Sequence, residues 1–135
     1  MTGVLCVLVA AVAAPVLAAG PIPQAQATKT AVTLVEVVPD LPDFPNAIMA
    51  SSHEKGPNDG WTHSWERETR TTAAYADVRA FYLDQFTKKG WTVTSTKDKP
   101  GKADWTLSKG AAWGRVTLDG GSAGLVKITV EWKTR

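Results

Sequence analysis

The chain has 135 residues, which allows one domain, and a formal net charge of +2. This mild charge argues against a nucleic-acid-binding protein, which needs a clustered basic surface. The charges are unevenly placed, because all 15 Lys and Arg residues and all 13 Asp and Glu residues lie from Lys29 onward. The start of the chain therefore differs in kind from the rest.

Residues 1–27 are typical of a secretory signal peptide. Val4–Ala19 is an unbroken apolar run, shorter than the roughly 20 residues of a membrane-spanning helix. We predict cleavage before Thr28, with an alternative site before Ala19, and no stable membrane span in the mature protein. Because no basic side chain precedes the run, we expect the natural start to lie upstream of Met1. The sequence thus predicts a periplasmic or extracellular protein.

Cys6, the single cysteine, lies inside this leader. Leu5 precedes it and the apolar run continues after it, which is not the context of a lipidated cysteine. The mature chain then has no cysteine and forms no disulfide, so its core must stabilise the fold unaided.

Three prolines between Pro39 and Pro45 exclude a helix and predict an extended lead-in over residues 28–43, followed by a single domain over 44–135. A short strand is predicted at residues 47–52. Asp-Gly at 59–60 then predicts a turn. Residues 61–70 alternate like a half-buried antiparallel strand, and its inward positions are Trp61, His63 and Trp65.

The period then changes to that of a helix over about residues 73–89. Val78, Phe81, Tyr82 and Phe86 share one face of it. Cations and a glycine close it at residues 88–90, as expected at a helix C-terminus.

The remaining chain alternates again. Strands are predicted at residues 91–96, 104–108 and 112–118, with a hairpin turn at 119–121. The last strand has the clearest alternation, and its inward positions are Val126, Ile128, Val130 and Trp132. The predicted class is α+β: a curved antiparallel sheet of about five to six strands with one amphipathic helix packed on one face.

A set of short motifs accompanies this order of elements. Pro42-Asp43-Phe44-Pro45-Asn46-Ala47 precedes the first strand, Val78 is followed by Phe81-Tyr82, and Gly90-Trp91 ends the helix. The combination resembles a pattern in small exported bacterial α+β proteins of unknown function, roughly P-x-[YF]-P-x-A, V-x-x-F-Y and G-W. This resemblance implies export and an α+β fold, and it transfers no functional residue.

The sequence carries no recognisable catalytic motif, and we expect no catalytic residue, metal or cofactor. His53-Glu54 begins like a zinc-protease helix, but Pro57 stands where the second histidine belongs. His63 lies between two inward tryptophans, which predicts a partly buried, hydrogen-bonded ring.

Tryptophan is the feature that stands out, with six in the chain. Strand parity places five of them in the core, whereas Trp113 shares its parity with Arg115. If that strand is regular, Trp113 lies exposed beside Arg115, a combination typical of binding hot spots. Alternatively, a bulge at Gly114 returns Trp113 to the core.

Lysines cluster in the sequence around the helix end and the turn after the following strand: residues 88, 89, 97, 99, 102 and 109. We predict a solvated loop region there, with contact to anionic glycans or lipid headgroups as the alternative. Two functions stay open. The first is a non-enzymatic exported binding or accessory domain whose partner is a protein, a peptide or an envelope glycan. The second is a small exported hydrolase acting on cell-wall or extracellular polymer.

Overall fold

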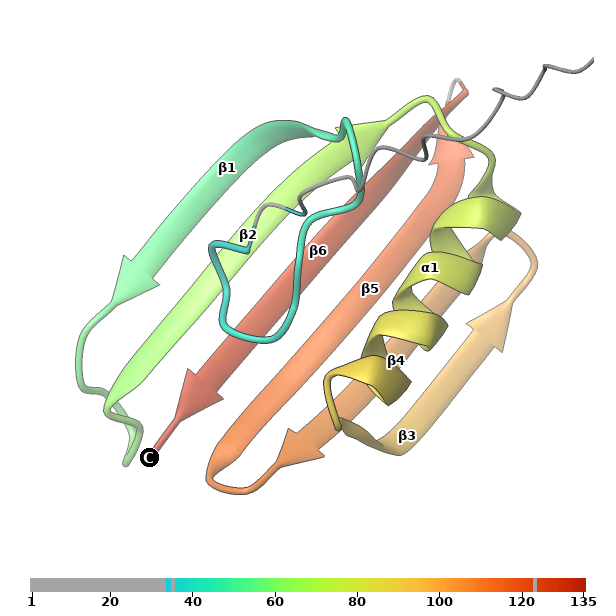
Figure 1. Ribbon diagram of the computed structural model, residues 1–135. Helices are drawn as coiled ribbons and strands as arrows, with labels where there is room; N and C mark the ends of the chain where they lie inside the picture. Colours follow the sequence, from blue (N-terminus) through green and yellow to red (C-terminus); the bar gives the residue numbers. More distant parts are fainter. Residues whose placement is uncertain (1–33, 35, 123) are drawn as a thin grey trace, which may run out of the picture. The chain divides into compact units, whose positions relative to one another are not determined.

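The computed structural model of the protein describes residues 34, 36–122 and 124–135, so the predicted signal peptide, residues 1–27, lies outside the described residues. In chain order the elements are β1 (Ile48–Lys55), β2 (His63–Thr71), α1 (Tyr75–Lys88), β3 (Thr92–Lys99), β4 (Lys102–Lys109), β5 (Ala112–Ser122) and β6 (Leu125–Thr134) (Figure 1). Within this described part of the chain, no helix has both the length and the apolarity needed to cross a bilayer.

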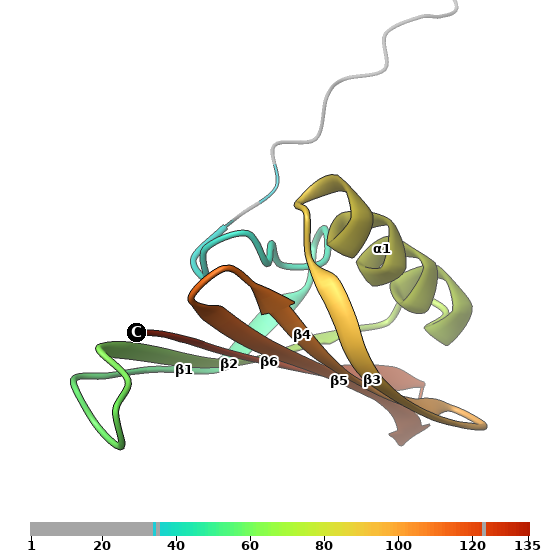
Figure 2. The ribbon, with the colours of Figure 1, turned by 90° about the horizontal axis from the view of Figure 1, so that it is seen from below.

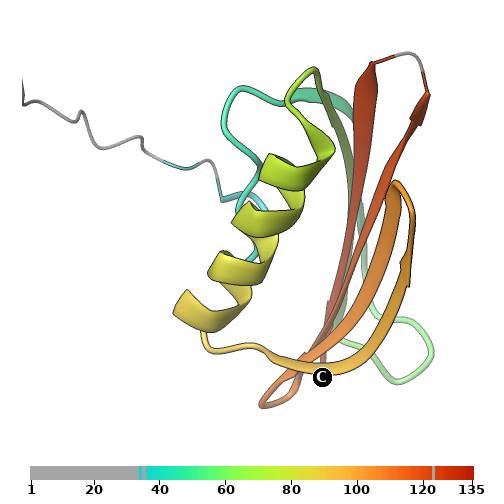
Figure 3. The same ribbon diagram turned by 90° about the vertical axis from the view of Figure 1, so that its right-hand side faces the viewer.

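The six strands form one antiparallel sheet in the order β1-β2-β6-β5-β4-β3. After β2 the chain runs through α1 to the opposite edge of the sheet, and β3 to β6 then return strand by strand toward β2. The sheet is curved, and α1 lies on one side of it, which we call the inner face (Figure 3). The predicted antiparallel sheet with one helix is confirmed.

The inner face is apolar because every second residue of the central strands points toward α1. The buried side chains from β4, β5 and β6 on this face are Ala103, Trp105, Leu107, Val116, Leu118, Val126, Ile128 and Val130. Helix α1 covers one half of this surface. Its Phe86 ring meets Trp105 edge to face, with centroids 5.4 Å apart, and the guanidinium of Arg79 lies 5.9 Å from the centre of the same Trp105 ring.

The ends of α1 explain how the chain enters and leaves it. Ala74 is the N-cap and supplies no side-chain hydrogen bond. At the other end Gly90 adopts φ +78°, a left-handed conformation that favours glycine, and the Trp91 amide donates to the Phe86 carbonyl at 2.8 Å. The observed helix lies within two residues of the predicted one at its N-terminus and one at its C-terminus.

Residues 36–47 cover the other half of the inner face, beside α1 (Figures 1 and 2). Val38 and Leu41 are 1% exposed, although both fall within the predicted extended lead-in, so the packed unit includes residues before Phe44. Asp43 is also buried and receives a two-pronged hydrogen bond from the Arg67 guanidinium of β2. That bond raises the pKa of Arg67.

Three local predictions are wrong. Trp61 lies in the β1–β2 loop before β2 begins and is half-buried outside the core, so it is not an inward position of that strand. Residues 119–121 do not form a hairpin turn: β5 continues to Ser122 through an irregular register, and the chain reverses beside Gly124, which has φ +73°. His63 has the predicted inward parity but lies at the end of β2, beyond the covering segments. Its side chain is therefore 54% exposed and not partly buried.

Candidate functional site

The side of the sheet opposite α1, the outer face, is open among the described residues. Both α1 and residues 36–47 lie on the inner face, and only the loop between β1 and β2 projects on the other side, near one end (Figures 2 and 3). The strand registers place Trp113, Lys133 and Ser64 in a row across β5, β6 and β2 on the outer face. Arg115 is next to Trp113 on the same face of β5. These four residues include both that were predicted for binding.

Trp113 lies on the outer face because β5 is regular there. The pairing of β4 with β5 runs without a shift through Gly114, so no bulge turns Trp113 inward. Gly114 itself faces the core, where a Cβ would come within 3.3 Å of Leu41 and 3.4 Å of Trp91. Trp113 is half-buried, with the Lys133 ammonium 5.2 Å from the centre of its ring.

Arg115 is held in place beside Trp113 by an ion pair with Asp104 of β4. Its Nε donates to one carboxylate oxygen at 3.1 Å and its Nη2 to the other. The guanidinium holds the pKa of Asp104 below its usual value, and the pKa of Arg115 is raised in turn. We call Trp113, Arg115 and Lys133 the Trp113 patch.

A hollow of about 170 Å³ adjoins this patch beneath the β1–β2 loop. Lys133 lines both, and the hollow also exposes Trp61, Glu66 and Glu131. Glu66 and Glu131 face each other across β2 and β6, and Glu131 is also opposite Arg115. The outer face around Trp113 is therefore a mosaic of positive, negative and aromatic groups.

Sequence reasoning missed Lys133. Strand alternation places Lys133 on the outward side of the last strand, but the pairing of β6 with β5 that brings it to Trp113 is not visible in the sequence. It also missed the pair between Arg67 and Asp43, although Arg67 shares the inward parity of Trp65, and a charge at an inward position signals a buried partner.

The two histidines are not brought together into a catalytic or metal site. Nδ1 of His63 lies 3.9 Å from a carboxylate oxygen of Glu54, beyond hydrogen-bond length, and both side chains are more than half exposed. His53 is opposite Glu66 on the outer face, whereas Glu54 is opposite Trp65 on the inner one. Among the described residues there is no group of three potential metal ligands.

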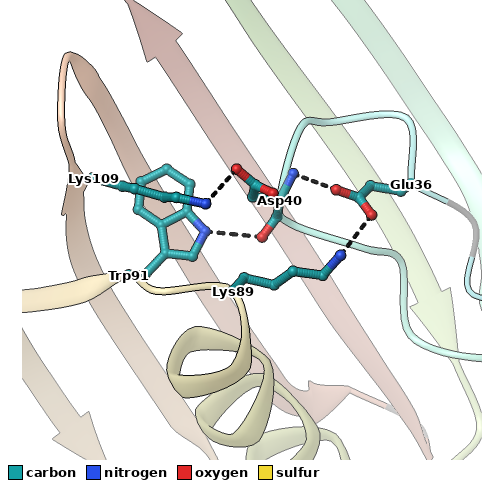
Figure 4. Close-up of polar contacts among 5 residues, drawn as sticks. All are labelled: Glu36, Asp40, Lys89, Trp91 and Lys109. Carbon is teal, nitrogen blue, oxygen red and sulfur yellow. Dashed lines mark hydrogen bonds and ion pairs between the residues drawn. The ribbon is translucent and has the colours of Figure 1, made fainter.

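The lysines that cluster in the sequence lie at opposite ends of the sheet. Lys89 and Lys109 lie where α1 and β4 end, and they bind the carboxylates of Glu36 and Asp40 at 2.8 and 2.7 Å (Figure 4). The Trp91 indole N–H donates to the Asp40 carbonyl at 2.8 Å in the same network. These two lysines hold residues 36–40 against the domain.

Lys88 ends α1 and pairs with Asp84 one turn earlier at 2.7 Å. The remaining three lysines of the sequence cluster, Lys97, Lys99 and Lys102, flank the β3–β4 turn at the far end of the strands. The predicted single lysine region is therefore wrong, because β3 carries the chain the whole length of the sheet between the two groups.

Comparison with known proteins gives a family and no activity. No curated protein matches this chain. Among solved structures, a protein of unknown function, PA94 from Pseudomonas aeruginosa, is similar to it, with a TM-score of 0.43 and 18% identity, covering 62% of this chain and 69% of that one. A family model described as START domain-like matches residues 48–124, from the start of β1 to the turn before β6 and more than half of the chain. The chain therefore belongs to the START domain-like family.

Proposed function

We propose that this protein is a non-enzymatic binding domain that works in the periplasm or outside the cell and holds a protein partner on its outer face, at the Trp113 patch. The observation that supports this most directly is the position of Trp113: a large aromatic side chain on the one sheet face that the described residues leave open. Tryptophan and arginine are among the residue types most enriched in binding hot spots.

The charge pattern around Trp113 favours a protein over a uniformly charged polymer. Opposite charges alternate at neighbouring positions, with Arg115 opposite Glu131 and Lys133 next to it along β6. Such a mosaic matches the mixed charges of a protein surface and sets orientation and partner choice. An anionic glycan would instead be repelled by Glu66 and Glu131.

Export rests on the sequence. The apolar run Val4–Ala19 and the absence of any charged side chain before Lys29 support a cleaved leader. N-terminal sequencing of the protein recovered from outside the cytoplasm tests it. We expect Thr28 or Ala19 as the first residue, and retention of the apolar run would contradict cleavage.

The binding test compares Trp113→Ala with Thr117→Ala, a matched control on the same face of β5. We expect Trp113→Ala to weaken binding of the partner at least about tenfold, the usual loss at a hot spot. Thr117→Ala should have little effect, and both variants should unfold at nearly the parent's urea concentration.

The partner is first captured from the cell envelope and then measured as a purified protein by calorimetry. Equal affinity of the two variants would rule out the Trp113 patch. Binding to purified envelope glycan, with no protein partner that distinguishes the variants, would overturn the choice of a protein.

A further inference from the structure

One end of the sheet combines exposed apolar and cationic side chains. It is the end that holds the β3–β4 and β5–β6 turns and the start of β1 (upper right in Figure 1). Ile48 and Met49 in β1 and Leu125 in β6 are 76%, 55% and 39% exposed, and all three line one hollow of about 350 Å³. They are three of the five large apolar side chains exposed among the described residues.

Arg70 lines this hollow, and four further cations lie along the same end of the sheet: Lys97, Lys99, Lys102 and Lys127. In the strand register Ile48 is opposite Arg70, which is opposite Lys127, and Lys102 is opposite Lys99 on the far side of Asp119. This row crosses all six strands as a band and carries cations on four of them, β2, β6, β4 and β3.

The carboxylates at this end do not balance the cations. Glu68 is shared by Arg70 and Lys127, at 3.0 and 2.9 Å, and Asp119 binds only Lys102, at 3.0 Å. Lys97 and Lys99 have no carboxylate within 4 Å among the described residues. Asp104 is opposite Lys97 but is bound by Arg115, and Asp98 of β3 is bound by Arg79. With these two pairs included there are seven cations and four carboxylates, so the band keeps a net positive charge.

We propose that this end of the domain, the docking end, binds the surface of an anionic lipid bilayer. Ile48, Met49 and Leu125 enter the boundary between headgroups and acyl chains, while the band of lysines and arginines pairs with lipid phosphates. Binding of this kind grows with both the buried apolar area and the attraction to anionic headgroups. A soluble polyanion would use the cations and leave the three apolar side chains in water, so their presence favours a membrane.

Trp113 lies away from this surface, although Arg115 of the Trp113 patch binds Asp104, which is opposite Lys97. Trp113 lies six positions along β5 from Asp119, the β5 member of the cationic row, which is about 20 Å of strand. A domain docked at this end would hold Trp113 away from the bilayer and free to bind. The two proposals therefore stand or fall independently.

The test measures binding of the full chain to vesicles of phosphatidylcholine with and without about 30 mol% phosphatidylglycerol. We expect binding only with the anionic lipid, and we expect added salt to weaken it. The double variant Lys97→Gln/Lys99→Gln should bind about 25-fold more weakly, since each cation near an anionic surface contributes about fivefold. Its matched control, Lys55→Gln/Lys88→Gln, removes the same charge elsewhere and should bind within about twofold of the parent.

The apolar contribution has its own pair of variants. Ile48→Ser/Leu125→Ser should weaken binding about tenfold, because both apolar side chains leave water only at the bilayer. Val93→Ser is the matched control: Val93 is as exposed as Leu125 but lies on β3, at the other end of the sheet. It should change binding less than about twofold.

Hydrogen exchange identifies the surface even if residues 1–33 also attach the full chain to vesicles. Anionic vesicles should slow exchange at residues 46–50 and 124–127 and leave residues 110–115 unchanged. If residues 46–50 and 124–127 are not protected, the docking end is not the membrane contact. The same conclusion follows if the test variants and their controls lose vesicle affinity equally. Binding to a soluble polyanion as tight as to vesicles, and insensitive to Ile48→Ser/Leu125→Ser, would also overturn the proposal.

Discussion

The two halves of the inner face are covered in different ways. Over β4 and β5 the cover is α1, and the contact is made by rings such as Phe86 on Trp105. Over β2 the cover is the proline-containing segment 36–47, and the contact includes the buried pair of Asp43 with Arg67. The first contact is non-directional and depends on volume, whereas the second depends on two groups that must meet in one geometry.

This difference explains how residues 36–47 hold a fixed path although they form no helix or strand. Val38 and Leu41 supply its apolar contact, and hydrogen bonds fix its path on both sides: Asp40 to Lys109 and Trp91, and Asp43 to Arg67. We therefore expect the fold to lose stability in the helix-covered half when side-chain volume is removed, and in the segment-covered half when a charged partner is removed.

The largest effect is expected from Phe86→Ala in the helix-covered half. Phe86 is 2% exposed, and its removal leaves a cavity between α1 and Trp105. The free energy of unfolding should fall by about 3–5 kcal/mol, measured by urea denaturation followed by far-UV circular dichroism. A loss below about 1 kcal/mol would mean that α1 does not hold this half of the core.

In the segment-covered half, Asp43→Ala should lower the free energy of unfolding by about 3 kcal/mol, because it leaves the Arg67 guanidinium buried without a carboxylate, with only the Met49 sulfur as acceptor. The double variant Asp43→Leu/Arg67→Met removes both charges and should recover most of that stability. If the double variant is as unstable as Asp43→Ala, the volume of the segment matters more than its pairing, and the contrast between the two halves disappears.

Gly114 lies where the two halves meet, because a Cβ there would touch both Leu41 of the segment and Trp91 after α1. Gly114→Val should cost about 1–3 kcal/mol of stability by overpacking this junction. Gly56→Ala is the control, since no atom lies within 4 Å of the added Cβ and the loop is exposed. An unchanged urea midpoint for Gly114→Val would show that the segment moves easily away from the sheet.

The part of the fold that the sequence predicts follows the same division between the helix-covered and segment-covered halves. The helix and the alternating strands follow from periods of 3.6 and 2, so α1 and the inward positions of β6 are predicted correctly. The cover by residues 36–47 is not predicted, because three prolines indicate an extended chain without saying what it packs on. Likewise, parity placed Trp113 beside Arg115, but Lys133 and Asp104 reach them only through the pairing of strands far apart in sequence.

The smallest effect is expected on the outer face, where ion pairs are half-exposed and neither half of the core is involved. Arg115 holds the pKa of Asp104 below its ordinary value of 3.8 in the folded state, so this pair stabilises the fold above about pH 4. The stabilisation is lost as the pH falls through the lower pKa of the folded state, where Asp104 takes up a proton.

Asp104→Asn should therefore lower the free energy of unfolding by no more than about 1 kcal/mol at pH 7, the range of exposed ion pairs. Urea denaturation of parent and variant at pH 7, 5 and below 3.8 measures the difference. It should be equal at the two higher values and shrink in acid. A stability difference that persists in acid would mean that Asp104 supports the fold by packing and not by its charge. The outer face would then depend on close packing, as the inner face does.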